Sequence, residues 1–248
     1  MGNQNKLRFL VVLLLTIFMI SAALSFDSPA LRRVFSGNEA TSRQTLIIDA
    51  GHGGEDGGAV SLSGVKESQI NLEIAKKLEL IAVFYGVPVV MTRTTEDLDY
   101  SASATTIRAK KAEDQKRRLT LINKTPNAVL ISIHQNTYPS GSPNGAQVLY
   151  APTGGSKPFA DVMQSSLIQA LDPKNRRTAS KIPDSILLMN NIKCPALLIE
   201  CGFLTNAAEE QRLLTDGYQI KIAATVAACY LTSRAGLYQT DFGGTNES

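Results

Sequence analysis

The sequence predicts an α/β fold, with one domain built on a twisted, mostly parallel or mixed sheet that helices flank. The first observation is that short apolar runs alternate along the chain with longer segments in which apolar residues recur three or four positions apart. The second is size, because 248 residues with 44% hydrophobic positions can bury one sizeable core. Both observations favour a single domain with short extensions at its ends.

Five short apolar runs are predicted to be strands. They cover residues 46–48, 87–91, 128–133, 147–150 and 196–199. Helices separate most of these runs, and that order favours parallel neighbours joined by crossover connections.

The clearest helix begins near Glu67, because Ile70, Ile74, Leu78 and Ile81 share one of its faces. It ends at 86–88, where glycine and proline give a stop signal. Three further helices are predicted, at 107–123, 159–171 and 218–233.

The N-terminus has the pattern of a targeting segment. Lys6 and Arg8 precede an uncharged run at 9–23, and small residues at Ala23 and Ser25 allow cleavage after Ser25. We expect residues 1–25 to be a signal peptide or an N-terminal membrane anchor, followed by a linker at 26–43, the main domain at 44–235 and a polar tail at 236–248. The protein is therefore expected to be exported and to act outside the cytoplasm.

Charge and cysteine content exclude several classes of protein. The net charge is only +3, and a basic cluster at 110–118 is explained equally by a solvated helix face and by an anionic partner. With no tryptophan and no nucleic-acid motif, we expect no nucleic-acid partner. Cys194 and Cys201 flank one predicted strand, which holds them roughly 20 Å apart, so they and Cys229 are predicted to be buried thiols.

The chain has only two histidines, His52 and His134, and each ends an apolar run that is predicted to be a strand. Chemistry in α/β proteins gathers at such strand ends, and imidazole is a common zinc ligand. A pair of hydrogen-bonded structural histidines is the alternative. The glycine-rich loop around His52 lacks the Gly-Lys-Ser/Thr ending of a Walker A motif and does not lead directly into a helix, which disfavours phosphate binding.

Two carboxylates are candidates for the same site. Glu67 stands at the start of a predicted helix, where it can stabilise the helix dipole or point back toward the first strand. Together with the two histidines it makes the donor set of a catalytic zinc site. Glu200 closes the most apolar strand and would be costly there unless it is paired or functional. It can act as a proton carrier in the same crevice, or form a salt bridge with Arg93 or Arg118.

In these residues and several others, the chain resembles the zinc-dependent N-acetylmuramoyl-L-alanine amidases of the amidase-3 family. The matching stretches, in order, are 48–54 with Asp56 and 58–59, then 64–67, 92–93, Arg118 with Asn123, 132–136 and 198–206. The resemblance implies a six-stranded sheet, one zinc ion held by His52, Glu67 and His134, and a catalytic Glu200. We also expect Asn136, within one of these stretches, to contact the substrate.

The implied reaction is hydrolysis of the amide that joins the lactyl group of N-acetylmuramic acid to L-alanine in peptidoglycan. The compact layout is similar to germination-specific, CwlD-type amidases that modify spore cortex; a vegetative autolysin is the alternative. The interval from His134 to Glu200 is too short for the autoinhibitory insertion of some division amidases. We therefore expect either constitutive access or control by a separate activating protein.

Three rival functions stay open at this stage. One is another zinc hydrolase, such as a carboxypeptidase acting on wall peptides. Another is a non-catalytic wall-binding protein, whose expected signature is loss of a ligand or of Glu200, and neither is lost. The third is a cysteine hydrolase using Cys201 and His134, although neighbouring strand residues point to opposite faces, so Glu200 and Cys201 cannot both enter the crevice.

Overall fold

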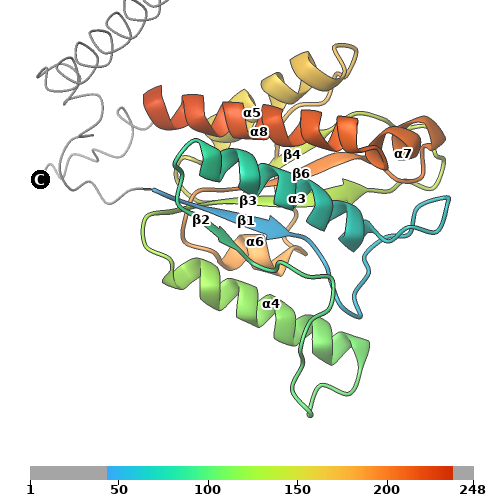
Figure 1. Cartoon of the computed structure of the whole chain (residues 1–248), viewed down its shortest axis with the longest axis vertical. Helices are drawn as coiled ribbons and strands as arrows, with labels where there is room; N and C mark the ends of the chain where they lie inside the picture. Colours follow the sequence, from blue (N-terminus) through green and yellow to red (C-terminus); the bar gives the residue numbers. More distant parts are fainter. Residues whose placement is uncertain (1–43, 237–248) are drawn as a thin grey trace, which may run out of the picture. The chain divides into compact units, whose positions relative to one another are not determined.

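Six strands form one mixed sheet in the computed structural model, which describes residues 44–236. The strands are β1 (Thr45–Ala50), β2 (Val89–Met91), β3 (Ala128–Asn136), β4 (Gln147–Tyr150), β5 (Ser180–Lys181) and β6 (Ala196–Phe203). Their order is β2-β1-β3-β6-β4-β5, and only the β4–β6 pair is antiparallel (Figure 1). The predicted α/β class and mixed six-stranded sheet are confirmed.

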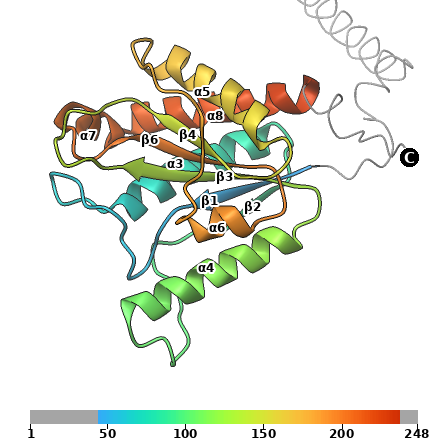
Figure 2. The ribbon, with the colours of Figure 1, turned by 180° about the vertical axis from the view of Figure 1, so that it is seen from behind.

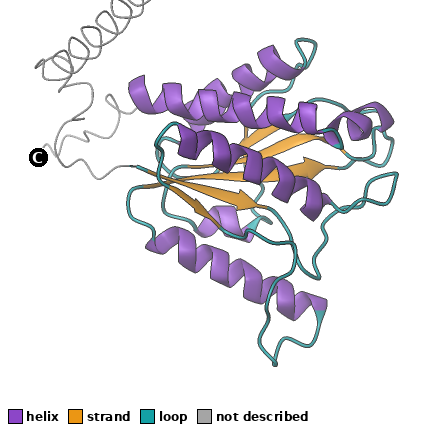
Figure 3. Cartoon of the chain, in the orientation of Figure 1, coloured by secondary structure: helices purple, strands orange, loops and turns teal. Residues whose placement is uncertain are grey.

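Helices cover both faces of this sheet (Figure 3). The helices α3 (Glu67–Phe84), α5 (Ser156–Leu171) and α8 (Asp216–Gly236) lie on one face, while α4 (Ile107–Lys124) and α6 (Leu187–Asn191) lie on the other (Figure 2). The short helix α7 (Ala207–Leu213) packs against β6 and α8. Each face therefore has its own buried apolar cluster.

The alternation of side chains along the strands decides which residues can share a site. On β6, Leu197, Ile199 and Cys201 enter the cluster beneath α3, α5 and α8, whereas Ala196 and Leu198 enter the cluster beneath α4 and α6. Glu200 alternates with Ala196 and Leu198 and therefore lies on the face of the sheet that α4 and α6 cover. By the same alternation, that face also carries Asp49 of β1 and, on β3, Ser132 and His134.

The predicted boundaries of two strands are wrong. His134 and Glu200 do not end their strands, because β3 continues to Asn136 and β6 to Phe203. Pairing of the two strands persists beyond His134 and Glu200, through a register shift, to Asn136 and Phe203. The apolar pattern missed these extensions because polar residues follow His134 on β3 and the charged Glu200 interrupts the apolar run of β6, although Cys201 and Phe203 beyond it are buried.

The sequence reasoning also missed β5, α6 and α7. The first two are too short to show a period. A signal for α7 was present, since the Asn206 side chain accepts hydrogen bonds from the amides of Ala208 and Glu209 and so caps the helix.

The predicted signal peptide or anchor at 1–25 and linker at 26–43 lie outside the described residues, as does the tail from 237 on. Within residues 44–236, no helix combines the length and the apolar character that crossing a membrane requires.

Candidate metal centre

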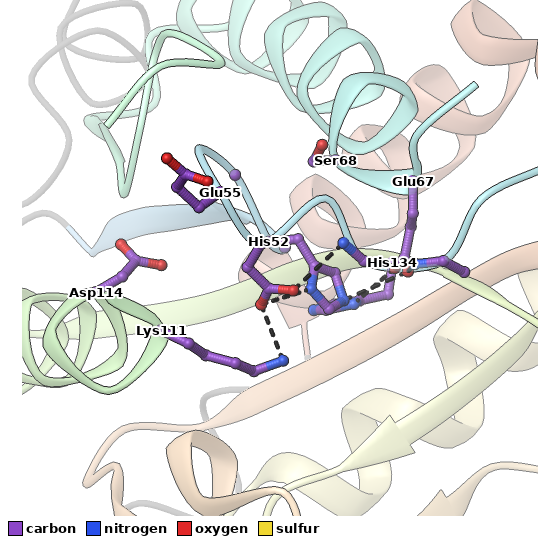
Figure 4. A network of polar contacts seen from close by, with 12 residues as sticks. His52, Glu55, Glu67, Ser68, Lys111, Asp114 and His134 are labelled. Atoms are coloured by element: carbon purple, nitrogen blue, oxygen red, sulfur yellow. Dashed lines mark hydrogen bonds and ion pairs between the residues drawn. The ribbon is translucent and has the colours of Figure 1, made fainter. Parts of the chain in front are cut away.

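His52, Glu67 and His134 come together although they lie far apart in the sequence. One donor atom from each lies within 4.8 Å of the donor atoms of the other two. Glu67 Oε2 is 3.4 Å from His52 Nε2, and Glu67 Oε1 is 3.0 Å from His134 Nδ1 (Figure 4). Two imidazoles and one carboxylate at this spacing can share one divalent cation.

Glu67 reaches this place because it is the first residue of α3, whose N-terminal part lies beside the end of β1, where Asn71 donates to the Gly51 carbonyl. Its carboxylate accepts hydrogen bonds from the amides of Ala59 and Gln135 and from the side chain of Asn71. Burial alone would raise the pKa of Glu67, but His134, His52 and the Ala59 amide outweigh it and lower the pKa to about 2. The carboxylate is thus held ionised, as a metal ligand must be.

His52 stands just beyond β1 in a left-handed conformation, with φ of 59°, which residues other than glycine adopt infrequently. Arg118 stabilises this turn by donating to the His52 carbonyl at 2.6 Å. A carboxylate can only accept, so the 3.0 Å contact to Asp56 Oδ2 requires His52 Nδ1 to donate. The lone pair of Nε2 is then free on the side that faces Glu67, an arrangement typical of metal-binding histidines.

Two glycines leave room for these side chains. A Cβ at Gly51 would lie 2.2 Å from His134 Nε2. At Gly58, which also has a positive φ of 69°, a Cβ would lie 2.6 Å from Glu67 Oε2. The site therefore accepts no side chain at either position. Its donor set and its cradle both fit a zinc ion.

Glu200 lies beside these donors, because β6 neighbours β3 and pairs Glu200 in register with His134. Its Oε2 atom is buried and has no hydrogen-bond partner among the described residues. Burial raises the pKa of Glu200 to about 7, with the negative charge of Glu67 adding to the rise and the histidines opposing it. An unpartnered buried carboxyl is costly, and such groups gather at functional sites.

Beneath the site, Asp49 and Arg118 form a buried ion pair with 2.6 Å between Arg118 NH1 and Asp49 Oδ1. Ser132 and Thr92 donate to the same carboxylate. Arg118 also binds Asp114, and Arg93 binds Glu96 and several carbonyls. Both arginines are therefore engaged elsewhere, and neither forms the salt bridge with Glu200 that the sequence left open.

The donors and Glu200 open into a cavity of about 340 Å³. The α4 side of its lining is polar and includes Lys111 and Gln115, whereas the side formed by residues 186–189, in and just before α6, is apolar. Sequence reasoning missed the apolar wall, because α6 has only five residues and shows no period. It also gave no role to Asp56 or Lys111, although both belong to segments that it singled out.

The remaining candidates lie outside this cavity. Asn136 is half-buried, is absent from the lining, and accepts a hydrogen bond at Oδ1 from the Thr137 amide, so its contact with substrate stays a prediction. Cys201 is 1% exposed and packs in the core on the opposite face of β6. Burial raises the pKa of its thiol, which contradicts a nucleophilic role. The three cysteines are free, as predicted; Cys201 and Cys229 are buried, whereas the predicted burial is wrong for Cys194, which is only partly buried.

Known proteins share this architecture. Residues 46–229 match the Amidase_3 family of N-acetylmuramoyl-L-alanine amidases. A germination-specific N-acetylmuramoyl-L-alanine amidase of Bacillus subtilis (strain 168) is 35% identical over 187 residues, which cover 75% of this chain and 77% of that protein.

Solved structures agree. The CwlD amidase from Clostridioides difficile, in complex with the GerS lipoprotein, matches with a TM-score of 0.74 and 33% identity over 77% of this chain and 98% of that one. An N-acetylmuramoyl-L-alanine amidase from Clostridium difficile 630 matches with a TM-score of 0.66 and 31% identity over 79% of this chain and 99% of that one. The chain therefore belongs to the Amidase_3 family and is an N-acetylmuramoyl-L-alanine amidase.

Proposed function

We propose that this protein uses one zinc ion to hydrolyse the amide bond between N-acetylmuramic acid and L-alanine in spore-cortex peptidoglycan. His52, Glu67 and His134 hold the ion, and Glu200 is the catalytic residue. One observation carries the proposal: three donors from distant segments meet within 4.8 Å beside a carboxyl group that has a buried, unpartnered oxygen.

When bound, zinc supplies a nucleophile at neutral pH by lowering the pKa of a water toward about 7, and it polarises the amide carbonyl. The chain's own groups do the rest. Glu200 lines the cavity, takes a proton from the attacking water and gives it to the leaving amine of L-alanine. Asp56 keeps the His52 ring in the tautomer whose Nε2 faces the site.

The cortex substrate is supported by similarity to the germination-specific relative, and a vegetative wall substrate is the alternative. A separate activating partner is supported by the CwlD structure, which contains a lipoprotein. Action outside the cytoplasm follows from the substrate. An N-terminal membrane anchor stays part of the proposal.

Digestion of purified cortex and vegetative peptidoglycan by the zinc-loaded protein, followed by mass analysis, tests this function. An amidase releases intact stem peptides with a free L-alanine amine, whereas a carboxypeptidase shortens the peptides and leaves them on the glycan. Faster digestion of vegetative wall than of cortex would reject the cortex assignment.

A parallel measurement tests the ligands. Glu67→Gln is expected to lose bound zinc, while Glu79→Gln, on the same helix but away from the site, keeps it. Full zinc content in Glu67→Gln would remove this residue from the ligand set.

A further inference from the structure

The basic cluster at 110–118 divides into different environments in the structure. Arg118 is buried between Asp49 and Asp114. Lys110 pairs with Glu55 at the surface, and Lys116 lies exposed on α4, outside the lining of the cavity. Lys111 alone of the cluster's lysines lines the cavity that holds the metal donors and Glu200. Lys111 is therefore both exposed on α4 and part of the cavity lining.

Lys111 is the cation in this lining that can meet a ligand. Its side chain is 45% exposed, and its Nζ lies 2.9 Å from Asp56 Oδ2. Arg118, the other cation of the lining, is 4% exposed, and its guanidinium donates to two carboxylates and two carbonyls. Figure 4 shows the Lys111 side chain reaching from α4 toward His52.

The carboxyl groups of the cavity lining favour a cation beside them. The lining holds the carboxyl groups of Asp56, Glu67 and Glu200, and Lys111 lies 2.9 Å from the first of these. A bound metal ion would offset the charge of Glu67, and the part of the substrate that lies away from the metal and carries negative charge is favoured only beside a positive group. Elsewhere in the lining, Ile186 and Leu187 are exposed and apolar, so that part of the cavity suits an uncharged group.

We infer that Lys111 determines specificity by binding a free carboxylate on the peptide part of the substrate. This inference rests on the proposed function. The carboxyl group of N-acetylmuramic acid is consumed in the amide bond, so the sugar side of the scissile bond is neutral. Negative charge can then come only from the peptide that follows L-alanine. Lys111 marks the side of the cavity where that peptide lies.

A purely structural role predicts something different. Lys111 and His52 bind the same oxygen of Asp56, so Lys111 could act only by orienting Asp56 and, through it, the imidazole. Loss of Lys111 would then slow every substrate equally. Recognition of a carboxylate instead affects substrates according to their charge.

The experiment compares soluble N-acetylmuramoyl-L-alanyl peptide fragments in two forms, one with free peptide carboxylates and one with these groups amidated. Steady-state kinetics are measured for the full-length wild type and for Lys111→Met, Lys111→Arg, Asp56→Asn and Lys116→Met. Lys116→Met removes the same charge from the same helix outside the cavity lining and serves as the matched control.

We expect the wild type and Lys116→Met to prefer the free-carboxylate form by about three- to tenfold in kcat/KM, the range of a half-exposed charge-assisted hydrogen bond. Lys111→Met should lose this preference through a higher KM for the free-carboxylate form, with kcat within about twofold of the wild type. Lys111→Arg should keep it. Asp56→Asn should lower kcat for both forms and retain the preference.

A wild type without preference, or a Lys111→Met variant that slows both forms equally, would overturn the inference. Release of L-alanyl peptides from peptidoglycan in that case leaves the proposed function standing. If the zinc-loaded wild type releases no such peptides, the proposed function fails and this inference fails with it.

Discussion

Glu200 and His134 are register partners on the adjacent parallel strands β6 and β3. Residues paired in this way place their side chains on the same face of a sheet, so the carboxyl group and the imidazole rise together toward α4 and α6. Backbone hydrogen bonds therefore set their separation. Sites held on strands keep their geometry better than sites held on loops.

Replacing Glu200 by Gln should remove the proton carrier and leave the rest of the site in place. We expect turnover to fall by roughly 10²–10⁴-fold, the usual contribution of general acid–base catalysis. Bound zinc, measured by elemental analysis, should not change. The melting temperature should not fall, because the variant replaces a carboxyl group with a buried, unpartnered oxygen. Wild-type turnover in Glu200→Gln would refute the role.

Replacing Gly51 by Ala should weaken metal binding without contact to the metal itself. The new Cβ would lie 2.2 Å from His134 Nε2 and 2.3 Å from Cε1, so the imidazole must move. We expect zinc affinity to drop by about 10–100-fold, as when the support of a ligand is lost. Competition with a chelator of known affinity measures the change. In the control Gly154→Ala, the Cβ meets nothing within 4 Å, and unchanged affinity is expected. Equal zinc affinities in the two variants would contradict the claim that Gly51 leaves the space that His134 needs.

The Asp49–Arg118 pair should make stability depend on pH in the acid range. Burial alone would raise the pKa of Asp49, but Arg118, Ser132 and Thr92 outweigh it and lower the pKa from 3.8 to about 2. A depressed pKa in the folded state gives stability that is present above about pH 4 and is lost as the pH falls through about 2. The shift corresponds to about 2 kcal/mol of unfolding free energy.

Urea unfolding of the wild type and Asp49→Asn at several pH values measures this effect. Other carboxylates titrate in both proteins, so the difference between the two isolates Asp49. The wild type should be the more stable at pH 6, and its advantage should shrink by about 2 kcal/mol at pH 2. An advantage that does not vary with pH would show that Asp49 does not titrate in this range.

Activity should be sensitive to chelators and resistant to thiol reagents. Removal of zinc is expected to abolish hydrolysis and to lower the melting temperature, because a ligand of the folded state stabilises it. Iodoacetamide should leave activity unchanged, since burial raises the pKa of all three cysteine thiols, that of Cys194 to about 11. Activity assays and mass analysis of alkylated protein check both points. Inactivation that accompanies alkylation of Cys201 would revive the cysteine-hydrolase alternative.

The strands and long helices could be predicted because their apolar residues repeat with the period of each element. Thus Ile70, Ile74 and Leu78 indicated α3, and all three are fully buried. The donors were predictable for another reason. His52 and Glu67 stand at element ends, where charged and polar groups need a functional or structural explanation. Short elements were missed, since α6 has no period and β5 has only two residues.

The sequence by itself determined the α/β class, the buried faces of the main elements and the chemical types available for a site, because periodicity and residue chemistry are local properties. Only the tertiary structure decided which of these residues meet. Strand order brought β1, β3 and β6 side by side, and register placed Glu200 beside His134 while turning Cys201 into the core. The same packing buried Arg118 against Asp49 and left Lys111 of the same helix exposed. Such contacts depend on pairings between distant segments, which no local pattern encodes.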